Sequence, residues 1–260
     1  MEKNELSKLL NSIDLFLIDI DDTLIPHLTV GVANKINREI ISKRFFYNKL
    51  NKPDHVLTTK ENLLFLFHAM FTRKWRLPKN KEDWGIVFLM LYYGIKLHMI
   101  KLINNFANFI HIRIGNACLI NNFLRLLKKM SINVKDYQYT NDQIKKSLYP
   151  GVSTLLKKIK AKKIAMSESF AVSQYKSVLG IDEVYCNTLQ KVIIKNSDDK
   201  YGIAKKLIQS KRSVGILMND YEDESLLKLP NIKLVIMKNP PWRLRKKADI
   251  TVTESYKDLF

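Results

Sequence analysis

The second half of the chain alternates two patterns of hydrophobic residues. Short apolar runs rich in β-favouring residues are separated by stretches in which apolar positions recur with helical spacing. This alternation predicts a parallel sheet with crossover helices on its faces. The predicted strands are residues 15–20, 163–167, 183–186, 213–218, 233–237 and 249–252. The helices predicted between them are residues 151–160, 171–179, 200–209 and 222–229.

Residues 26–148 interrupt this alternation after the first strand. They have little strand pattern and several long helical patterns, at residues 33–47, 60–76, 83–112, 116–130 and 141–148. The sheet pattern resumes at the sequence Tyr149-Pro150-Gly151-Val152. We therefore predict a doubly wound, Rossmann-like α/β core formed by residues 1–25 and 149–260, with residues 26–148 inserted as an all-helical domain.

Charge is distributed unevenly between these two parts. The 260-residue chain has a formal net charge of +19, and residues 26–148 hold 21 Lys and Arg against 7 Asp and Glu. The excess is interpreted either as attraction for an anion, such as a phosphorylated substrate, an acidic membrane or a nucleic acid, or as the codon bias of an AT-rich genome. Both interpretations stay open.

Two further features concern the compartment. Two cysteines, Cys118 and Cys186, are too few for a disulfide framework, which favours a reducing compartment, the cytoplasm. The apolar stretch 84–112 has no uncharged piece longer than residues 84–95, 12 residues against the roughly 20 that a bilayer requires. No transmembrane segment is therefore predicted.

The end of the first predicted strand carries the strongest candidate chemistry. Asp19 and Asp21 follow an apolar run at spacing i, i+2, and Thr23 comes next. They share one face if the strand continues, and converge beyond its end if the chain turns there. Because close carboxylates repel each other, such a pair requires a metal ion, a shared proton or water. The alternative is a solvated turn.

Other polar residues follow neighbouring strands of the predicted sheet, at the edge where open α/β sheets bind ligands. Ser167 ends one strand, and Lys195 or Lys200 precedes or opens a helix. The sequence MNDYEDE begins at the end of another strand and contains Asp220. This ordered set resembles the motifs of the haloacid dehalogenase superfamily. DIDDTL fits the first motif in every position, Ser167 fits the second, MNDYEDE fits the fourth, and the resemblance extends to the final strand and closing helix.

The resemblance implies a phosphatase with a helical cap inserted after the first strand. Asp19 would be the nucleophile that forms an aspartyl-phosphate intermediate, and Asp21 the general acid and base. Thr23, Ser167 and Lys195 (or Lys200) would bind the phosphoryl group. Mg²⁺ would be held by Asp19, the backbone carbonyl of Asp21 and Asp220, with Asp223 or Glu224 in its outer shell. Asp21 argues against dehalogenation, which needs no acid for its leaving group.

Three positions depart from the superfamily pattern. Lys195 and Lys200 match two different forms of the lysine motif, and Lys195 is preferred. Glu224 stands where Asp is more usual, beside Asp223. Glu168 follows Ser167 where an uncharged polar residue is commoner; it is interpreted either as a residue that alters substrate access or as a solvated loop residue.

The predicted function is Mg²⁺-dependent hydrolysis of a phosphate monoester of a small metabolite, with the cap selecting the substrate. Phosphomutase activity would use the same chemistry. The alternative is that the basic, apolar cap docks on an anionic membrane or nucleic acid, with catalysis vestigial or aimed at a lipid phosphate. A second basic run, residues 243–247, is predicted to be a solvated loop.

Overall fold

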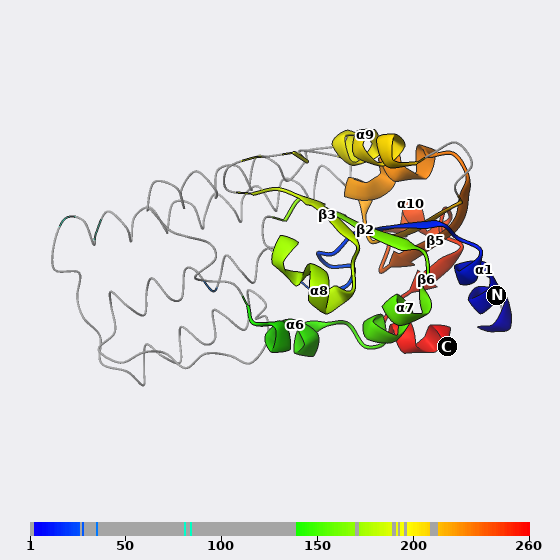
Figure 1. The fold of residues 1–260 in the computed structure, drawn as a ribbon, viewed down its shortest axis with the longest axis horizontal. Helices are drawn as coiled ribbons and strands as arrows, with labels where there is room; N and C mark the ends of the chain where they lie inside the picture. The colour runs from blue at the N-terminus through cyan, green and yellow to red at the C-terminus, as the bar shows by residue number, and fades with distance from the viewer. Residues whose placement is uncertain are drawn as a thin grey trace.

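The computed structural model describes residues 3–26, 28, 35, 81, 84, 139–169, 172–188, 191, 193–194, 197–208 and 213–260. In this part of the chain one six-stranded sheet has the order β3-β2-β1-β4-β5-β6, and all its neighbouring strands are parallel (Figure 1). The strands are β1 Leu15–Ile18, β2 Lys162–Ser167, β3 Glu183–Cys186, β4 Val214–Met218, β5 Ile232–Lys238 and β6 Ile250–Val252. The strand order reverses direction beside β1, which is the switch point where doubly wound sheets bind ligands. The predicted fold class is confirmed.

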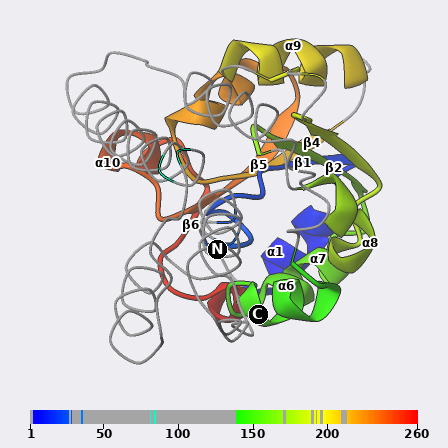
Figure 2. The same cartoon turned by 90° about the vertical axis from the view of Figure 1, so that its left-hand side faces the viewer.

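Helices cover both faces of this sheet (Figures 1 and 2). One hydrophobic cluster joins the sheet to α1 Lys3–Asn11, α6 Asn141–Ser147, α7 Val152–Lys158, η2 Ser173–Tyr175, α8 Lys176–Leu179 and η4 Tyr256–Leu259. The second cluster, on the opposite face, joins it to α9 Ser197–Leu207, η3 Tyr221–Lys228 and α10 Trp242–Arg245.

The central strand β1 shows why its sequence is apolar at every position. Phe16 and Ile18 point into the first cluster, whereas Leu15 and Leu17 point into the second. A parallel strand covered by helices on both faces has no solvent side, so it needs no polar alternation. The ring of Phe16 lies against Gly215 of β4, where a Cβ atom would overlap it, so glycine permits this close packing.

All six predicted strands are present, with ends that differ from the prediction by at most two residues. The helical regions differ more. Helix α1 was not predicted, and α9 begins three residues before the predicted residue 200. The predicted helix 171–179 is the short 3₁₀ helix η2 followed by α8, and the predicted helix 222–229 is the 3₁₀ helix η3. The prediction of a solvated loop at residues 243–247 is wrong in part, because Leu244 is buried in the second cluster and the chain forms α10 around it.

The predicted insertion lies almost entirely outside the described residues, and its boundaries stay a prediction. Helix α6 confirms the last helical pattern; its N-terminus is closed by a capping box between Thr140 and Gln143. The amide of Tyr149 donates to the carbonyl of Leu24 at 3.0 Å, so the two ends of the predicted insertion are adjacent. None of the helices that the structure describes is long and apolar enough to cross a membrane.

Candidate active site

Asp19 lies directly beyond β1, at the carboxyl edge of the sheet. Its amide donates to the carbonyl of Leu217 at 2.9 Å, which extends the pairing of β1 with β4 by one residue. Asp19 is 7% exposed. The nucleophile predicted from the sequence is therefore held on the sheet edge by main-chain bonds, and its carboxylate is almost closed off from solvent.

The chain turns sharply after Asp19. The carbonyl of Ile20 accepts hydrogen bonds from the amides of Leu24 and Ile25, and Asp22 adopts a positive φ of 58° at the tip of the turn. Asp tolerates this left-handed conformation better than most residues. The turn brings Thr23 back, and its Oγ1 donates to Oδ2 of Asp19 at 2.9 Å.

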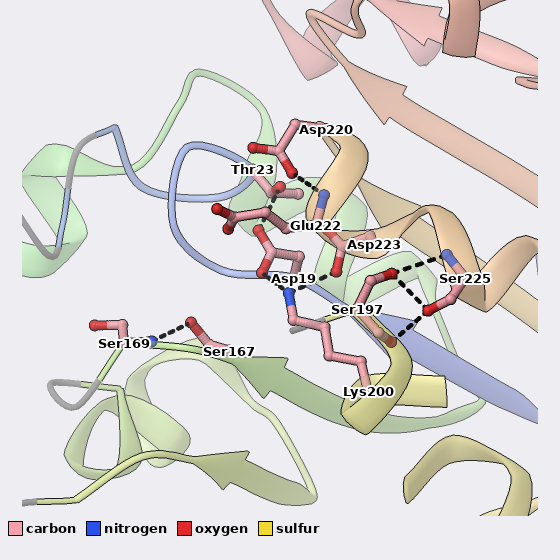
Figure 3. Close-up of polar contacts among 10 residues, drawn as sticks. All are labelled: Asp19, Thr23, Ser167, Ser169, Ser197, Lys200, Asp220, Glu222, Asp223 and Ser225. Atoms are coloured by element: carbon pink, nitrogen blue, oxygen red, sulfur yellow. Dashed lines mark hydrogen bonds and ion pairs between the residues drawn. The ribbon is translucent and has the colours of Figure 1, made fainter. Parts of the chain in front are cut away.

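The other oxygen of Asp19 is bound by a buried lysine. The Nζ of Lys200, on α9, donates to Oδ1 of Asp19 at 3.2 Å and to Oδ1 of Asp223 at 2.6 Å (Figure 3). Lys200 and Asp223 are each 1% exposed. Burial lowers the pKa of Lys200, but the charges of Asp19 and Asp223 outweigh it and hold that pKa well above its usual value.

Two buried serines fix the helices that carry this ion pair. The amide of Ser225 donates to Oγ of Ser197 at 2.9 Å, and its hydroxyl donates to the carbonyl of Ser197. The two hydroxyl oxygens lie 2.5 Å apart. Since Ser197 opens α9 and Ser225 lies in η3, these bonds hold Lys200 and Asp223 in register.

Further carboxylates follow β4. Asp220 caps η3, and its Oδ1 accepts from the amide of Glu222 at 2.8 Å. Burial and the nearby charge of Asp19 raise the pKa of Asp220 to about 6. Burial and Asp220 likewise raise the pKa of Glu222, and burial raises that of Asp223. Negative charge is thus concentrated at this edge beyond what Lys200 offsets.

The end of β2 contributes Ser167 and Glu168. Ser167 is 1% exposed, and its Oγ accepts from the amide of Ser169 at 3.2 Å. Glu168 is 6% exposed, so the interpretation of Glu168 as a solvated loop residue is wrong. Its carbonyl accepts a hydrogen bond from the buried side chain of Asn187 at 3.0 Å. Burial raises the pKa of Glu168 to about 7.

The sequence left two choices open, one between two lysines and one between two acidic residues. The structure places the members of each choice differently, while their chemical roles stay predictions. Lys200 contacts Asp19, whereas the preferred Lys195 lies outside the described residues. Asp223 contacts Lys200 inside the site, whereas Glu224 accepts from Lys247 at 2.8 Å near the surface. Asp21 is half-buried in the same turn as Thr23.

Sequence reasoning missed Tyr256. This residue of η4 is fully buried, and its hydroxyl donates to the carbonyl of Thr23 at 2.9 Å. Gly151 lets the chain pass closely over η4, because its φ of 86° is left-handed and a Cβ there would overlap the main chain of Lys257. No local motif marks a tyrosine so distant in sequence from the residue that it contacts.

The expected Mg²⁺ can be tested against the donor set. Asp19, Asp220 and the carbonyl of Asp21 offer the hard oxygen ligands that Mg²⁺ prefers, and the raised pKa of Asp220 reflects negative charge that a cation would offset. Among the described residues no three acidic, histidine or cysteine side chains gather as a metal site. The donor set fits Mg²⁺ as two carboxylates and a main-chain oxygen, completed by phosphate and water.

Fold and site together define a doubly wound α/β protein with a carboxylate-rich site at its switch point. No protein-family model matches the chain, and no curated protein matches it. Among solved structures, a phosphoserine phosphatase in apo form is similar, with a TM-score of 0.51 and 17% identity over 95% of this chain and 97% of the other. A HAD family hydrolase from Salmonella enterica subsp. enterica serovar Typhi has a TM-score of 0.51 and 13% identity over 99% of this chain and 78% of the other. The chain therefore has the fold of the haloacid dehalogenase (HAD) hydrolases.

Proposed function

We propose that this chain is a phosphatase of the haloacid dehalogenase type, which hydrolyses a phosphate monoester of a small metabolite with Mg²⁺. The observation that carries the proposal is the arrangement around Asp19, whose two carboxylate oxygens are held by Thr23 and Lys200 at the sheet's switch point. The fold supports it, since both similar structures carry the name of a phosphatase or hydrolase.

Asp19 would attack phosphorus and form an aspartyl-phosphate, which replaces one difficult hydrolysis with two easier steps. Its hydrogen bonds with Thr23 and Lys200 limit the rotation of the carboxylate, so the attacking oxygen is already oriented. Asp21 would protonate the leaving oxygen and then take a proton from the hydrolytic water.

Ser167 and Lys200 would bind the transferring phosphoryl oxygens, Thr23 would assist through its hold on Asp19, and Lys195 remains the alternative lysine. A fixed positive charge in a water-poor site stabilises the charge that develops on these oxygens. Mg²⁺, held by Asp19, Asp220 and the Asp21 carbonyl with Asp223 in its outer shell, would offset the repulsion between the nucleophile and the anionic phosphate.

Residues 26–148 are proposed as the cap that selects the substrate, and the low cysteine content supports a cytoplasmic location. Docking of the basic cap on an anionic membrane or a nucleic acid depends on residues outside the described part of the chain and stays a prediction.

The test is a phosphate-release screen with Mg²⁺ over sugar phosphates, nucleotides, phospho-amino acids and lipid phosphates. We expect release from at least one class, which chelation abolishes and Asp19→Asn lowers at least about 10³-fold. Asp22→Asn is the matched control, because asparagine also tolerates the positive φ at the tip of the same turn. Conversion of a substrate to an isomer without free phosphate would indicate a phosphomutase, and no reaction with any class would refute the proposal.

A further inference from the structure

Trp242, the first residue of α10, is the most exposed large apolar side chain in the described part of the chain. It is 68% exposed, whereas Leu244 of the same helix is 0% exposed and packs in the second cluster. Helix α10 is therefore fixed to the core while its indole ring stays in water. A single exposed apolar residue is common on protein surfaces, so the role of Trp242 depends on what surrounds it.

Basic side chains surround Trp242. Residues 243–247 are all basic and exposed except for the buried Leu244, and no acidic residue lies among them. The Nζ of Lys247 donates to Glu224 at 2.8 Å. The other three basic residues, Arg243, Arg245 and Lys246, form no ion pair with any other described residue. Three positive charges at this helix are thus available to a partner.

The geometry of α10 places the ring and the charges on one outward side. Successive residues of a helix are rotated by about 100°, so Trp242 and Lys246, each two residues from the inward Leu244, face away from the core. Arg243 and Arg245 lie on the two flanks. The guanidinium of Arg243 lies 5.1 Å from the centroid of the Trp242 ring, which holds the ring among the charges.

We propose that this α10 surface, formed by Trp242, Arg243, Arg245 and Lys246, docks on a membrane that carries anionic lipids. Tryptophan rings favour the headgroup level of a bilayer, and basic side chains are attracted to the negative surface potential of anionic headgroups. The surface belongs to the α/β core, so its docking is independent of the basic residues 26–148.

A lipid surface fits this combination of groups better than a nucleic acid does. A DNA duplex offers phosphates to the basic side chains, but it covers an exposed indole ring only where base pairs are unstacked. A single strand would stack a base on the ring, over which the guanidinium of Arg243 already lies. The headgroup region of a bilayer accepts the ring and the charges together.

The α10 surface is connected to the candidate active site. Only residues 239–241 separate α10 from the carboxyl end of β5, and the sheet's carboxyl edge carries Asp19. The bond between Lys247 and Glu224 ties the end of α10 to η3, which also carries Asp223. Docking through α10 therefore brings this edge of the sheet close to the lipid headgroups.

The test is sedimentation of the full chain with vesicles of phosphatidylcholine, with or without about one-third phosphatidylserine. We expect binding to the anionic vesicles that weakens when the salt rises from about 0.1 M to about 0.5 M. The triple variant Arg243→Gln, Arg245→Gln, Lys246→Gln should lower the affinity about fivefold for each residue, about 100-fold in all. Trp242→Ala should lower it at least about fivefold.

The matched control removes three positive charges elsewhere, in the triple variant Lys145→Gln, Lys146→Gln, Lys157→Gln. These exposed lysines lie on α6 and α7, which cover the opposite face of the sheet (Figure 2). Screening by salt separates them from a membrane at α10, so we expect the affinity to fall less than about threefold. All the replaced side chains are exposed, so thermal unfolding of each variant should match that of the wild type.

Five results would overturn the inference. They are no binding to the anionic vesicles, equal losses in the two triple variants, no loss in the α10 triple variant, unchanged affinity in Trp242→Ala, and tighter binding of a DNA duplex that the α10 triple variant loses. Equal losses would mean that net charge alone attracts the chain, and no loss would place the docking elsewhere. Because the readout is binding, none of these results bears on the proposed phosphatase function.

Discussion

Two kinds of buried charge lie near Asp19, and their partners differ. On the paired side, Lys200 bridges Asp19 and Asp223 in a closed ion-paired group, and the serine pair of α9 and η3 supports it (Figure 3). On the unpaired side, Glu168 is also buried, but its carboxylate oxygens have no hydrogen-bond partner among the described residues.

This difference indicates that the paired group positions the nucleophile, whereas the unpaired acid is suited to binding a ligand. A paired buried charge is rigid, because removing either partner leaves the other uncompensated, and this rigidity orients the nucleophile. An unpaired buried charge raises the free energy of the empty site and is relieved when a ligand arrives. Four substitutions test this contrast.

Removing the cation of the ion-paired group should have the largest effect on stability. Lys200→Met keeps much of the side-chain volume but leaves Asp19 and Asp223 buried without their cation. We expect a loss of about 3–5 kcal/mol in the free energy of unfolding, measured with urea in metal-free buffer. Lys206→Met, at an exposed position of the same helix, is the matched control and should change stability by less than about 0.5 kcal/mol.

Adding Asp223→Asn to Lys200→Met should recover at least about 1 kcal/mol, because one of the two stranded charges is removed. Equal losses in Lys200→Met and Lys206→Met, or no recovery in the double variant, would contradict the account of a closed ion-paired group.

Neutralising the unpaired side should have the opposite effect on stability. The pKa of Glu168 is raised from 4.5 to about 7, so the folded chain retains a proton that the unfolded chain has released. Stability should therefore fall as the pH rises from about 4.5 to about 7. Glu168→Gln removes this contribution, and we expect it to be up to about 3 kcal/mol more stable than the wild type at pH 7.5, with little difference at pH 4.5.

The measurement is urea unfolding at several pH values without metal or substrate. Asp220, Glu222 and Asp223 also have raised pKa values, so the stability of Glu168→Gln should still decline with pH, but less steeply. A variant less stable than the wild type at pH 7.5 would mean that Glu168 already has a partner.

Removing the hydrogen bond between Tyr256 and the turn that holds Thr23 should have a smaller effect on stability. Tyr256→Phe deletes the hydrogen bond to the Thr23 carbonyl, and we expect a loss of about 1–2 kcal/mol in stability together with a several-fold fall in kcat at unchanged KM. Tyr175→Phe is the control, because this buried tyrosine bonds to the main chain of Tyr139 instead. It should lower stability by a similar amount and leave kcat unchanged; equal falls in kcat for both variants would refute a specific role for Tyr256.

The smallest effect is expected at Glu224. Its partner Lys247 has a side chain that is 51% exposed, and exposed ion pairs contribute little. Glu224→Gln should change the free energy of unfolding by less than about 0.5 kcal/mol in thermal or urea unfolding. A loss above about 2 kcal/mol would place Glu224, rather than Asp223, in the paired group.

The fold followed from the sequence because its signals are local. The apolar run of β1 and the alternation after residue 149 depend on neighbouring positions, and the structure confirms all six strands. Helix α1 has Leu6, Leu9 and Leu10 at helical spacing, a short pattern that the prediction did not use. The reason for α10 is instead the burial of Leu244 in a cluster formed by distant elements, and such packing leaves no periodicity in the local sequence.

The sequence predicted the site residues that belong to recognisable motifs, but not the contacts between distant residues. Asp19, Thr23, Ser167 and Asp220 stand at the strand ends where the sequence predicts them, but their chemical roles stay predictions. The contact of Lys200 with Asp19 depends on where α9 begins, three residues before the predicted start. The buried Asn187, which bonds to the carbonyl of Glu168, stands at a position that no motif identifies.

The account depends most on Asp19 as a covalent nucleophile beside its paired lysine. A substrate identified in the screen, labelled with ³²P and mixed with the enzyme and Mg²⁺, should give a protein-bound label after acid quench within one turnover. The account predicts that hydroxylamine releases this label, as expected for an acyl phosphate, that Asp22→Asn retains it and that Asp19→Asn lacks it. Phosphate release without labelled protein, or a label that persists in Asp19→Asn, would contradict it.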